Sequence, residues 1–142
     1  MRGERGSVSL LGIGFIAIIL MAIVVAVDAG SYFLQKRNLA ATADAAALAG
    51  AQQIDFPSYY RNGATARTKL DTAKVKGLVL AQLNAAQARD RFANFSIRRI
   101  SSTGRQVDVT LSAVATTPFL SMLHQRPLIT VDSTAELNYR SS

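Results

Sequence analysis

A long apolar segment without a single charged residue, Val8 to Val27, is the strongest pattern in the chain. At 1.5 Å per residue, a helix over this segment is about 30 Å long, which matches the hydrocarbon core of a bilayer. The pattern therefore predicts one transmembrane helix over residues 8–27. A cleaved signal peptide is the alternative, because residues 26–30 (AVDAG) have the small side chains of a cleavage site.

Helix-forming residues continue beyond the apolar segment. Strong helix formers dominate from Ala29 to Gln53, and no proline or turn cluster occurs before the sequence from Asp55 to Ser58. We therefore expect the transmembrane helix to continue outside the membrane through residues 28–54. The whole helix would contain about 45 residues and extend roughly 67 Å.

Small residues recur at every fourth position in both parts of this helix, and this spacing places each set on one face. The first set allows two membrane helices to approach closely, although an alanine-rich composition alone can also produce it. The second set permits close packing of the outer part of the helix on another surface. The candidate helix-packing residues are Ala22, Ala26 and Gly30 in the first set and Ala43, Ala47 and Ala51 in the second.

Charged residues bracket the apolar segment and indicate its orientation. The tail of residues 1–7 carries two arginines close to the apolar segment, which favour a cytoplasmic N-terminus. The two basic residues after the segment favour the opposite orientation, but they lie farther from it. Everything after Gly30 is then extracytoplasmic. Asp28 can cap a backbone amine or pair with Lys36 of a neighbouring subunit, but a hydrated carboxylate is the simpler interpretation. The membrane-edge charges are Arg2, Arg5, Asp28, Lys36 and Arg37, and the basic ones attract anionic lipid headgroups.

The remaining residues, 55–142, are predicted to form an extracytoplasmic α+β domain. Loop signals at Pro57, Asn62 and Gly63 precede a second, amphipathic helix from Ala64 to about Asp90. The opposite face of this helix is charged, which is typical of a helix that packs on a core. Its apolar face comprises Val75, Leu78, Val79, Leu83 and Ala86.

Beyond Arg91 the apolar positions alternate with polar ones, which predicts strands. A strand at 95–100 and a strand at 107–115 form a hairpin through a turn at 101–105, and a third strand covers 129–139. The apolar face of this antiparallel sheet must be covered by the second helix, by the outer half of the N-terminal helix, or by both.

A short helix of one to two turns is expected at residues 117–124, with Thr117 as the N-cap and Pro118 in the first turn. The predicted fold class is therefore α+β with an N-terminal transmembrane helix. It combines the long N-terminal helix, a second amphipathic helix and a small three-stranded antiparallel sheet, which is a pilin-like plan at the level of analogy.

The composition gives little support for chemistry. The net charge of +7 arises from 16 basic and 9 acidic residues that are spread along the chain, which is a weak case for nucleic-acid binding. The absence of cysteine excludes disulfides and thiol nucleophiles, and the only histidine, His124, has no acid nearby in sequence. We therefore expect no enzymatic activity, no cofactor, no metal site, no small-molecule substrate and no nucleic-acid partner.

Several N-terminal motifs together resemble a known family. They are Glu4-Arg-Gly-Ser-Val8, Val27-Asp28, Gly30, Tyr32, Leu34, Arg37, Leu39 and the sequence ADAAALAGA from Ala43 to Ala51. This combination resembles the N-terminal region of TadE/TadG-like proteins of the Tad (Flp) tight-adherence pilus system. The resemblance implies a short TadG-like member without the added C-terminal domain of longer members. Leu11 stands where precursors cut after a glycine such as Gly6 usually have glutamate, so an unprocessed N-terminus is expected.

The resemblance implies a membrane-anchored structural or assembly component of a Tad/Flp-type pilus or secretion apparatus. It would lie in a bacterial inner membrane with its C-terminal domain in the periplasm, and its partners would be membrane lipid and other pilus or secretion proteins. The residues leave a second hypothesis open, an accessory single-pass subunit of another large membrane complex, bound through its transmembrane helix. A third hypothesis is a secreted domain released by cleavage near Asp28.

Overall fold

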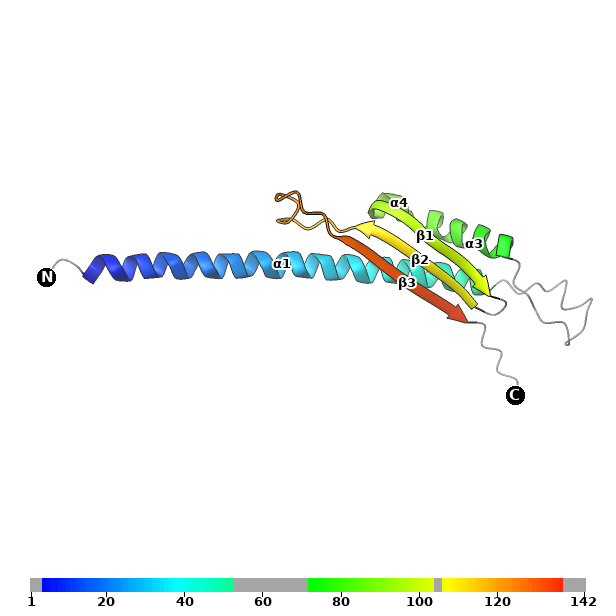
Figure 1. Ribbon diagram of the computed structural model, residues 1–142, viewed down its shortest axis with the longest axis horizontal. Coiled ribbons are helices and arrows are strands. Elements are labelled where there is room, and N and C mark those ends of the chain that lie inside the picture. The colour runs from blue at the N-terminus through cyan, green and yellow to red at the C-terminus, as the bar shows by residue number, and fades with distance from the viewer. Residues whose placement is uncertain (1–3, 53–71, 104–105, 137–142) are drawn as a thin grey trace, which may run out of the picture. The chain divides into compact units, whose positions relative to one another are not determined.

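A long helix and a three-stranded sheet dominate the computed structural model (Figure 1), which describes residues 4–52, 72–103 and 106–136. This arrangement confirms the predicted α+β class with its long N-terminal helix, second helix and small antiparallel sheet. The elements in chain order are α1 (Glu4–Ala51), α3 (Thr72–Ala85), α4 (Ala88–Arg91), β1 (Ala93–Thr103), β2 (Gln106–Val114) and β3 (Leu128–Glu136).

The chain divides into two compact units. The first comprises Met1–Leu34 and Thr116–Arg126, and the second comprises Gln35–Ala115 and Pro127–Ser142. Helix α1 is unbroken over its 48 residues, so helical structure does continue beyond the apolar segment as expected. At 1.5 Å per residue it is about 72 Å long.

The sheet in the second unit has the strand order β1-β2-β3, and both pairs are antiparallel. Strands β2 and β3 pair without irregularity from Gln106↔Glu136 to Val114↔Leu128. The β1–β2 ladder extends to Thr103↔Gln106, so residues 101–103 belong to β1 and not to the predicted turn. Serine and threonine are compatible with a pleated strand, and these three residues therefore extend the ladder.

Strand β1 contains a β-bulge, so the strict alternation that the sequence predicts for this strand is wrong. Ile97 pairs with Leu111 and Ile100 pairs with Val109, with a shift of register between the two pairs. Leu111 and Val109 are two residues apart and both fully buried, so their partners lie on the same face although they are three residues apart. The extra residue, Arg98, absorbs the difference, as in a bulge.

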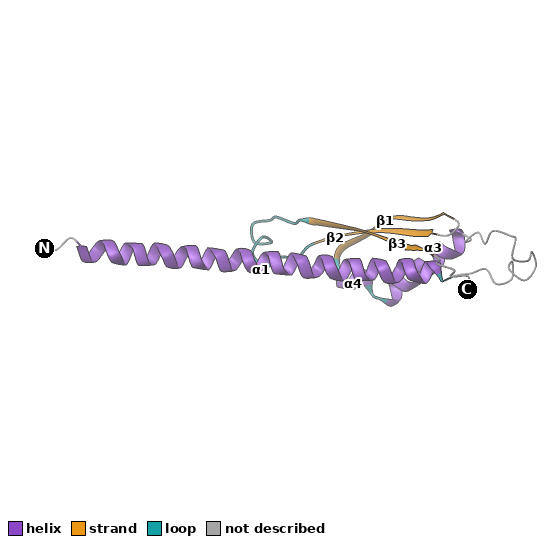
Figure 2. Cartoon of the chain, turned by 90° about the horizontal axis from the view of Figure 1, so that it is seen from below, coloured by secondary structure: helices purple, strands orange, loops and turns teal. Residues whose placement is uncertain are grey.

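The core of the second unit lies between the sheet and two helices, the outer part of α1 and α3 (Figures 1 and 2). Both predicted covers of the sheet are therefore used. In the second unit, the buried positions of α1 follow the helical period and belong almost entirely to small residues. They are Leu39, Thr42, Ala43, Ala46, Ala47, Gly50 and Ala51. They are joined in the core by Val75, Val79 and Leu83 of α3 and by Val107, Val109, Leu111, Ala113, Ile129 and Val131 of the sheet.

At Gly50, α1 approaches both α3 and β2 closely. A Cβ atom at this position would lie 3.0 Å from Val79 Cγ2 and 3.2 Å from both Val75 Cγ1 and Val107 Cγ1. Contacts this short leave no room for a larger side chain unless the neighbours move. The absence of a side chain at Gly50 therefore permits three elements to meet at one place.

The second helix is shorter than the sequence predicts. Helix α3 ends at Ala85, and Gln87 adopts the left-handed conformation with φ of 49° before the single turn of α4. A left-handed residue ends a helix and redirects the chain, which here leads into β1. The prediction of one helix to about Asp90 is therefore wrong at its C-terminal end. Its start at 64–71, the loop signals at 57–63, the Gly104-Arg105 turn and the end of the third strand at 137–139 lie outside the described residues.

The close approach at Gly50 yields a prediction about stability. A Gly50→Leu variant places a side chain against Val75, Val79 and Val107, and overpacking of this kind costs about 1–3 kcal/mol of unfolding free energy. Urea unfolding in detergent, followed by circular dichroism, measures the loss. The matched control is Gly77→Leu, because a Cβ at Gly77 meets nothing within 4 Å. That control should be neutral or stabilising by up to about 1 kcal/mol, and equal stabilities of the two variants would contradict the packing described for Gly50.

Candidate functional site: the apolar helix and the Asp28 contact

The first part of α1 presents apolar side chains that the other described residues do not cover. An 18-residue window in this helix has a mean hydropathy of 3.1, and none of it is buried. Large side chains along it are mostly exposed, including Phe15 at 64% and Met21 at 71%. Soluble monomers rarely expose contiguous apolar patches beyond a few hundred Å². By length and composition, this helix is suited to cross a membrane.

The two sets of small residues have different environments. Ala22, Ala26 and Gly30 are exposed, and a Cβ atom at Gly30 would meet nothing within 4 Å. The first set is therefore open to a neighbouring helix. The second set is buried in the core of the second unit, where its members are Ala43, Ala47 and Ala51.

The membrane-edge charges are also not alike. Lys36 and Arg37 are exposed on α1. Arg2 lies outside the described residues, and only the backbone of Arg5 is described, as part of α1. Asp28 is the exception, because its side chain is only 6% exposed.

Asp28 is held by two backbone amides from a distant part of the chain. Its Oδ1 accepts a hydrogen bond from the Phe119 amide at 3.0 Å, and its Oδ2 accepts one from the Leu120 amide at 2.8 Å. The simpler interpretation of a hydrated carboxylate is therefore wrong, and the alternative of a carboxylate that caps backbone amines is correct. A hydrogen bond to a charged group contributes about 1.5–3 kcal/mol, so the pair fixes this contact firmly.

Residues 118–124, called the turn segment below, form consecutive tight turns instead of the predicted short helix. The amides of Met122, Leu123 and His124 each bond to a carbonyl three residues earlier, and His124 has a positive φ of 58°. Thr117 does not act as the N-cap. Its hydroxyl is buried and, within the described part of the chain, has no hydrogen-bond partner. Asp28 performs the capping instead, because a carboxylate offers two charged acceptors to two amides.

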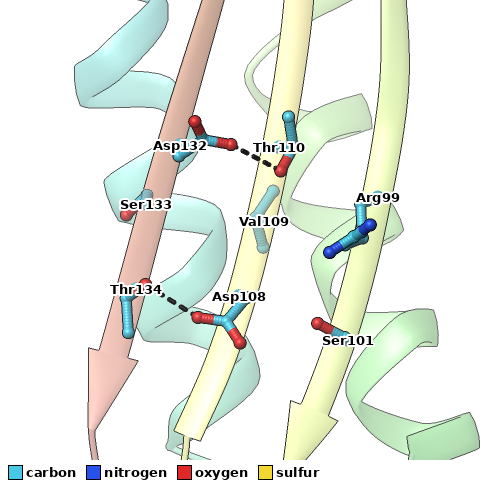
Figure 3. Close-up of a pocket in the computed structure, with 8 residues that line it drawn as sticks. All are labelled: Arg99, Ser101, Asp108, Val109, Thr110, Asp132, Ser133 and Thr134. Carbon is cyan, nitrogen blue, oxygen red and sulfur yellow. Dashed lines mark hydrogen bonds between the residues drawn. The ribbon is translucent and has the colours of Figure 1, made fainter.

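The outer face of the sheet has a small polar hollow, shown in Figure 3, that is a second candidate site. Two hydroxyl–carboxylate pairs cross it, Thr110 to Asp132 and Thr134 to Asp108, both at 2.7 Å. The residues of each pair are directly opposite in the β2–β3 register. The volume of about 210 Å³ is below the roughly 300 Å³ at which ligand pockets begin. These pairs therefore account for the hollow as cross-strand stabilisation of the sheet.

One comparison with known proteins matches part of the chain to a family model. The family model described as "Putative Flp pilus-assembly TadE/G-like" matches residues 6–53. The matched range covers most of α1, including the apolar segment, Asp28 and both sets of small residues. No curated protein and no solved structure matches the chain.

The Asp28 contact yields a prediction about local stability. An Asp28→Ala variant removes both acceptors, and the Phe119 and Leu120 amides should then exchange their hydrogens with solvent roughly tenfold to a hundredfold faster. Hydrogen–deuterium exchange of the protein in detergent micelles measures this change. The matched control is Asp90→Ala, which removes an exposed carboxylate from α4 and should leave both amides unchanged. Unaltered exchange in Asp28→Ala would show that the contact does not hold the turn segment.

Proposed function

We propose that this chain, whose residues 6–53 match the TadE/G-like family model, is a membrane-anchored structural or assembly component of a Flp-type pilus or secretion apparatus. The family match relates the chain to pilus assembly, and it is the observation that carries the proposal. In this proposal the apolar part of α1 is the anchor. The second unit is the part that meets other components outside the membrane.

The proposed location is the inner membrane of a bacterium, with the N-terminus in the cytoplasm and the second unit in the periplasm. The exposed apolar surface of α1 supports a position in a membrane. The two arginines of the N-terminal tail support the orientation under the positive-inside rule. Lys36 and Arg37 would then lie near the outer headgroups, where exposed basic side chains can meet lipid phosphates.

We propose a structural role and not a catalytic one. The single histidine, His124, is exposed in the turn segment, and none of the three residues on either side of it in the sequence is acidic. The carboxylates that line the hollow of the sheet already accept hydroxyl hydrogen bonds across the strands. Binding to other proteins therefore fits the described surfaces better than chemistry does.

The exposed small residues of α1 are the surface that we propose for contact with other membrane proteins. Ala22, Ala26 and Gly30 share one face, and small residues at this spacing let helix backbones approach closely in a bilayer. The same surface would serve an accessory subunit of another large membrane complex, which is the second candidate function. The family match favours a pilus or secretion partner.

The proposed function predicts a loss of pili. Deletion of the gene from its own bacterium should strongly reduce Flp pili in sheared surface fractions and reduce adherence to surfaces. The unaltered chain and Gly77→Leu should restore both, whereas Gly50→Leu should restore less because its core is overpacked. Normal pilus production in the deletion strain would refute the proposal. Co-purification of the chain with a complex unrelated to pili would favour the accessory-subunit alternative.

The proposed orientation predicts a labelling pattern. The chain contains no cysteine, so a single introduced cysteine reports one position without background. A cysteine at the exposed Asn84 on α3 should react with a membrane-impermeant maleimide in intact spheroplasts. A cysteine at Gly3 should react only after lysis. The reverse pattern would overturn the orientation, and loss of the N-terminal residues from the mature protein by mass spectrometry would favour cleavage near Asp28.

A further inference from the structure

The Asp28 contact fixes the turn segment at one level of α1. Asp28 directly follows the apolar segment, and it bonds to the amides of Phe119 and Leu120 in the same compact unit. The turn segment therefore lies beside the helix residue at which the uncharged span ends. If the span crosses a bilayer, this level is the outer boundary of the hydrocarbon core.

The turn segment exposes large apolar side chains at this level. Phe119 is 39% exposed, Met122 is 75% exposed and Leu123 is 71% exposed. A short loop of an aqueous domain usually presents polar side chains, so three exposed apolar groups within five residues need an apolar environment. The exposed Arg126 follows them, which suits a boundary between acyl chains and phosphates.

Helix α1 itself remains apolar beyond Asp28. Phe33 is 66% exposed and Leu34 is 60% exposed, and the first basic residue after the span is Lys36. Phe33 lies five residues after Asp28, which corresponds to about 7.5 Å along the helix axis. The stretch without basic residues from Gly6 to Gln35 is about 45 Å long, which equals a bilayer with its headgroup layers. In a helix that spans the bilayer over this stretch, Asp28 would lie inside the interface and not at its aqueous edge.

We propose that the turn segment is seated in the outer interface of the bilayer, with Phe119, Met122 and Leu123 against lipid. This inference rests on the proposed membrane anchoring. The continuity of these side chains with the apolar surface of α1 identifies lipid as the occupant, because the bilayer that surrounds the span also surrounds anything bound to the helix at the same level. The turn segment in turn supplies the two amides that hold Asp28, so the carboxylate is screened from acyl chains.

The natural absence of tryptophan allows a direct test by fluorescence. Single tryptophans are introduced at Met122 and, separately, at Leu123, both of which are exposed and can accept a larger side chain. Ile18→Trp is the control within the span, and Asn84→Trp is the control on the exposed surface of α3. The full chain is reconstituted at low density in phosphatidylcholine and phosphatidylglycerol vesicles that contain lipids brominated either near the headgroup or near the methyl end.

The tryptophans at positions 122 and 123 should emit at shorter wavelength than that of Asn84→Trp. Bromines near the headgroup should quench them several-fold more strongly than they quench Asn84→Trp. Deep bromines should act most strongly on Ile18→Trp. The inference would be overturned if aqueous acrylamide quenched both turn-segment tryptophans as strongly as it quenches Asn84→Trp and if brominated lipids did not quench them. If the two tryptophans were shielded from acrylamide only at high protein density, a second copy of the chain, and not lipid, would cover the turn segment. An Ile18→Trp reporter that lipid bromines do not reach would instead refute the anchoring itself.

Discussion

In the proposed membrane-anchored arrangement, every backbone amide in the apolar part of α1 must find its hydrogen bond within the helix, because a bilayer interior offers no water to replace it. The unbroken helix and its exposed apolar side chains meet this constraint. The constraint ends where water is available, but the helix does not end there. Its outer part, from Gln35 to Ala51, becomes a wall of the core in the second unit. One helix thus meets two environments, and its composition changes from large apolar to small residues accordingly.

The contact at Asp28 links this helix to a segment that the chain reaches only after most of the domain is complete. The partners are 91 and 92 residues apart in sequence. Closing a loop of this length is entropically costly, and two charge-assisted hydrogen bonds offset part of that cost. A carboxylate that would be unfavourable near acyl chains becomes the attachment point of the turn segment. The same charge therefore serves local folding and defines a position along the helix.

The features that the sequence could reveal are those that repeat with a regular period. The alternation in Val107 to Ala115 and the helical spacing of Val75, Val79 and Leu83 report burial directly, and the uncharged span reports a long apolar helix that the described chain leaves exposed. The structure has the corresponding elements. The pilus-family resemblance likewise depended on local motifs, and the family model matches the same region. The location of the membrane, the partner proteins and the role of the small residues in the span remain predictions.

The features that the sequence could not reveal depend on single residues or on distant contacts. One inserted residue, Arg98, reverses the faces of the strand after it, and no local pattern distinguishes it from its neighbours. Gln87 ends a helix in a conformation that its side chain does not favour, because the chain must turn towards β1. The role of Asp28 depends on residues more than ninety positions away, which no window of sequence contains.

The small residues on the buried face of α1 also affect how much side-chain conformational entropy the second unit loses when it folds. Alanine and glycine have no side-chain rotamers to lose when they are buried, unlike leucine or methionine. The buried residues Ala43, Ala46, Ala47, Gly50 and Ala51 therefore dock without any loss of side-chain conformational entropy, and on this face of the helix only Leu39 and Thr42 have rotamers to lose. This saving suits a chain with no tryptophan and only ten other aromatic residues, six phenylalanines and four tyrosines, to supply large buried groups. Small side chains give less contact area at each position, but they also lose less side-chain entropy when the core forms.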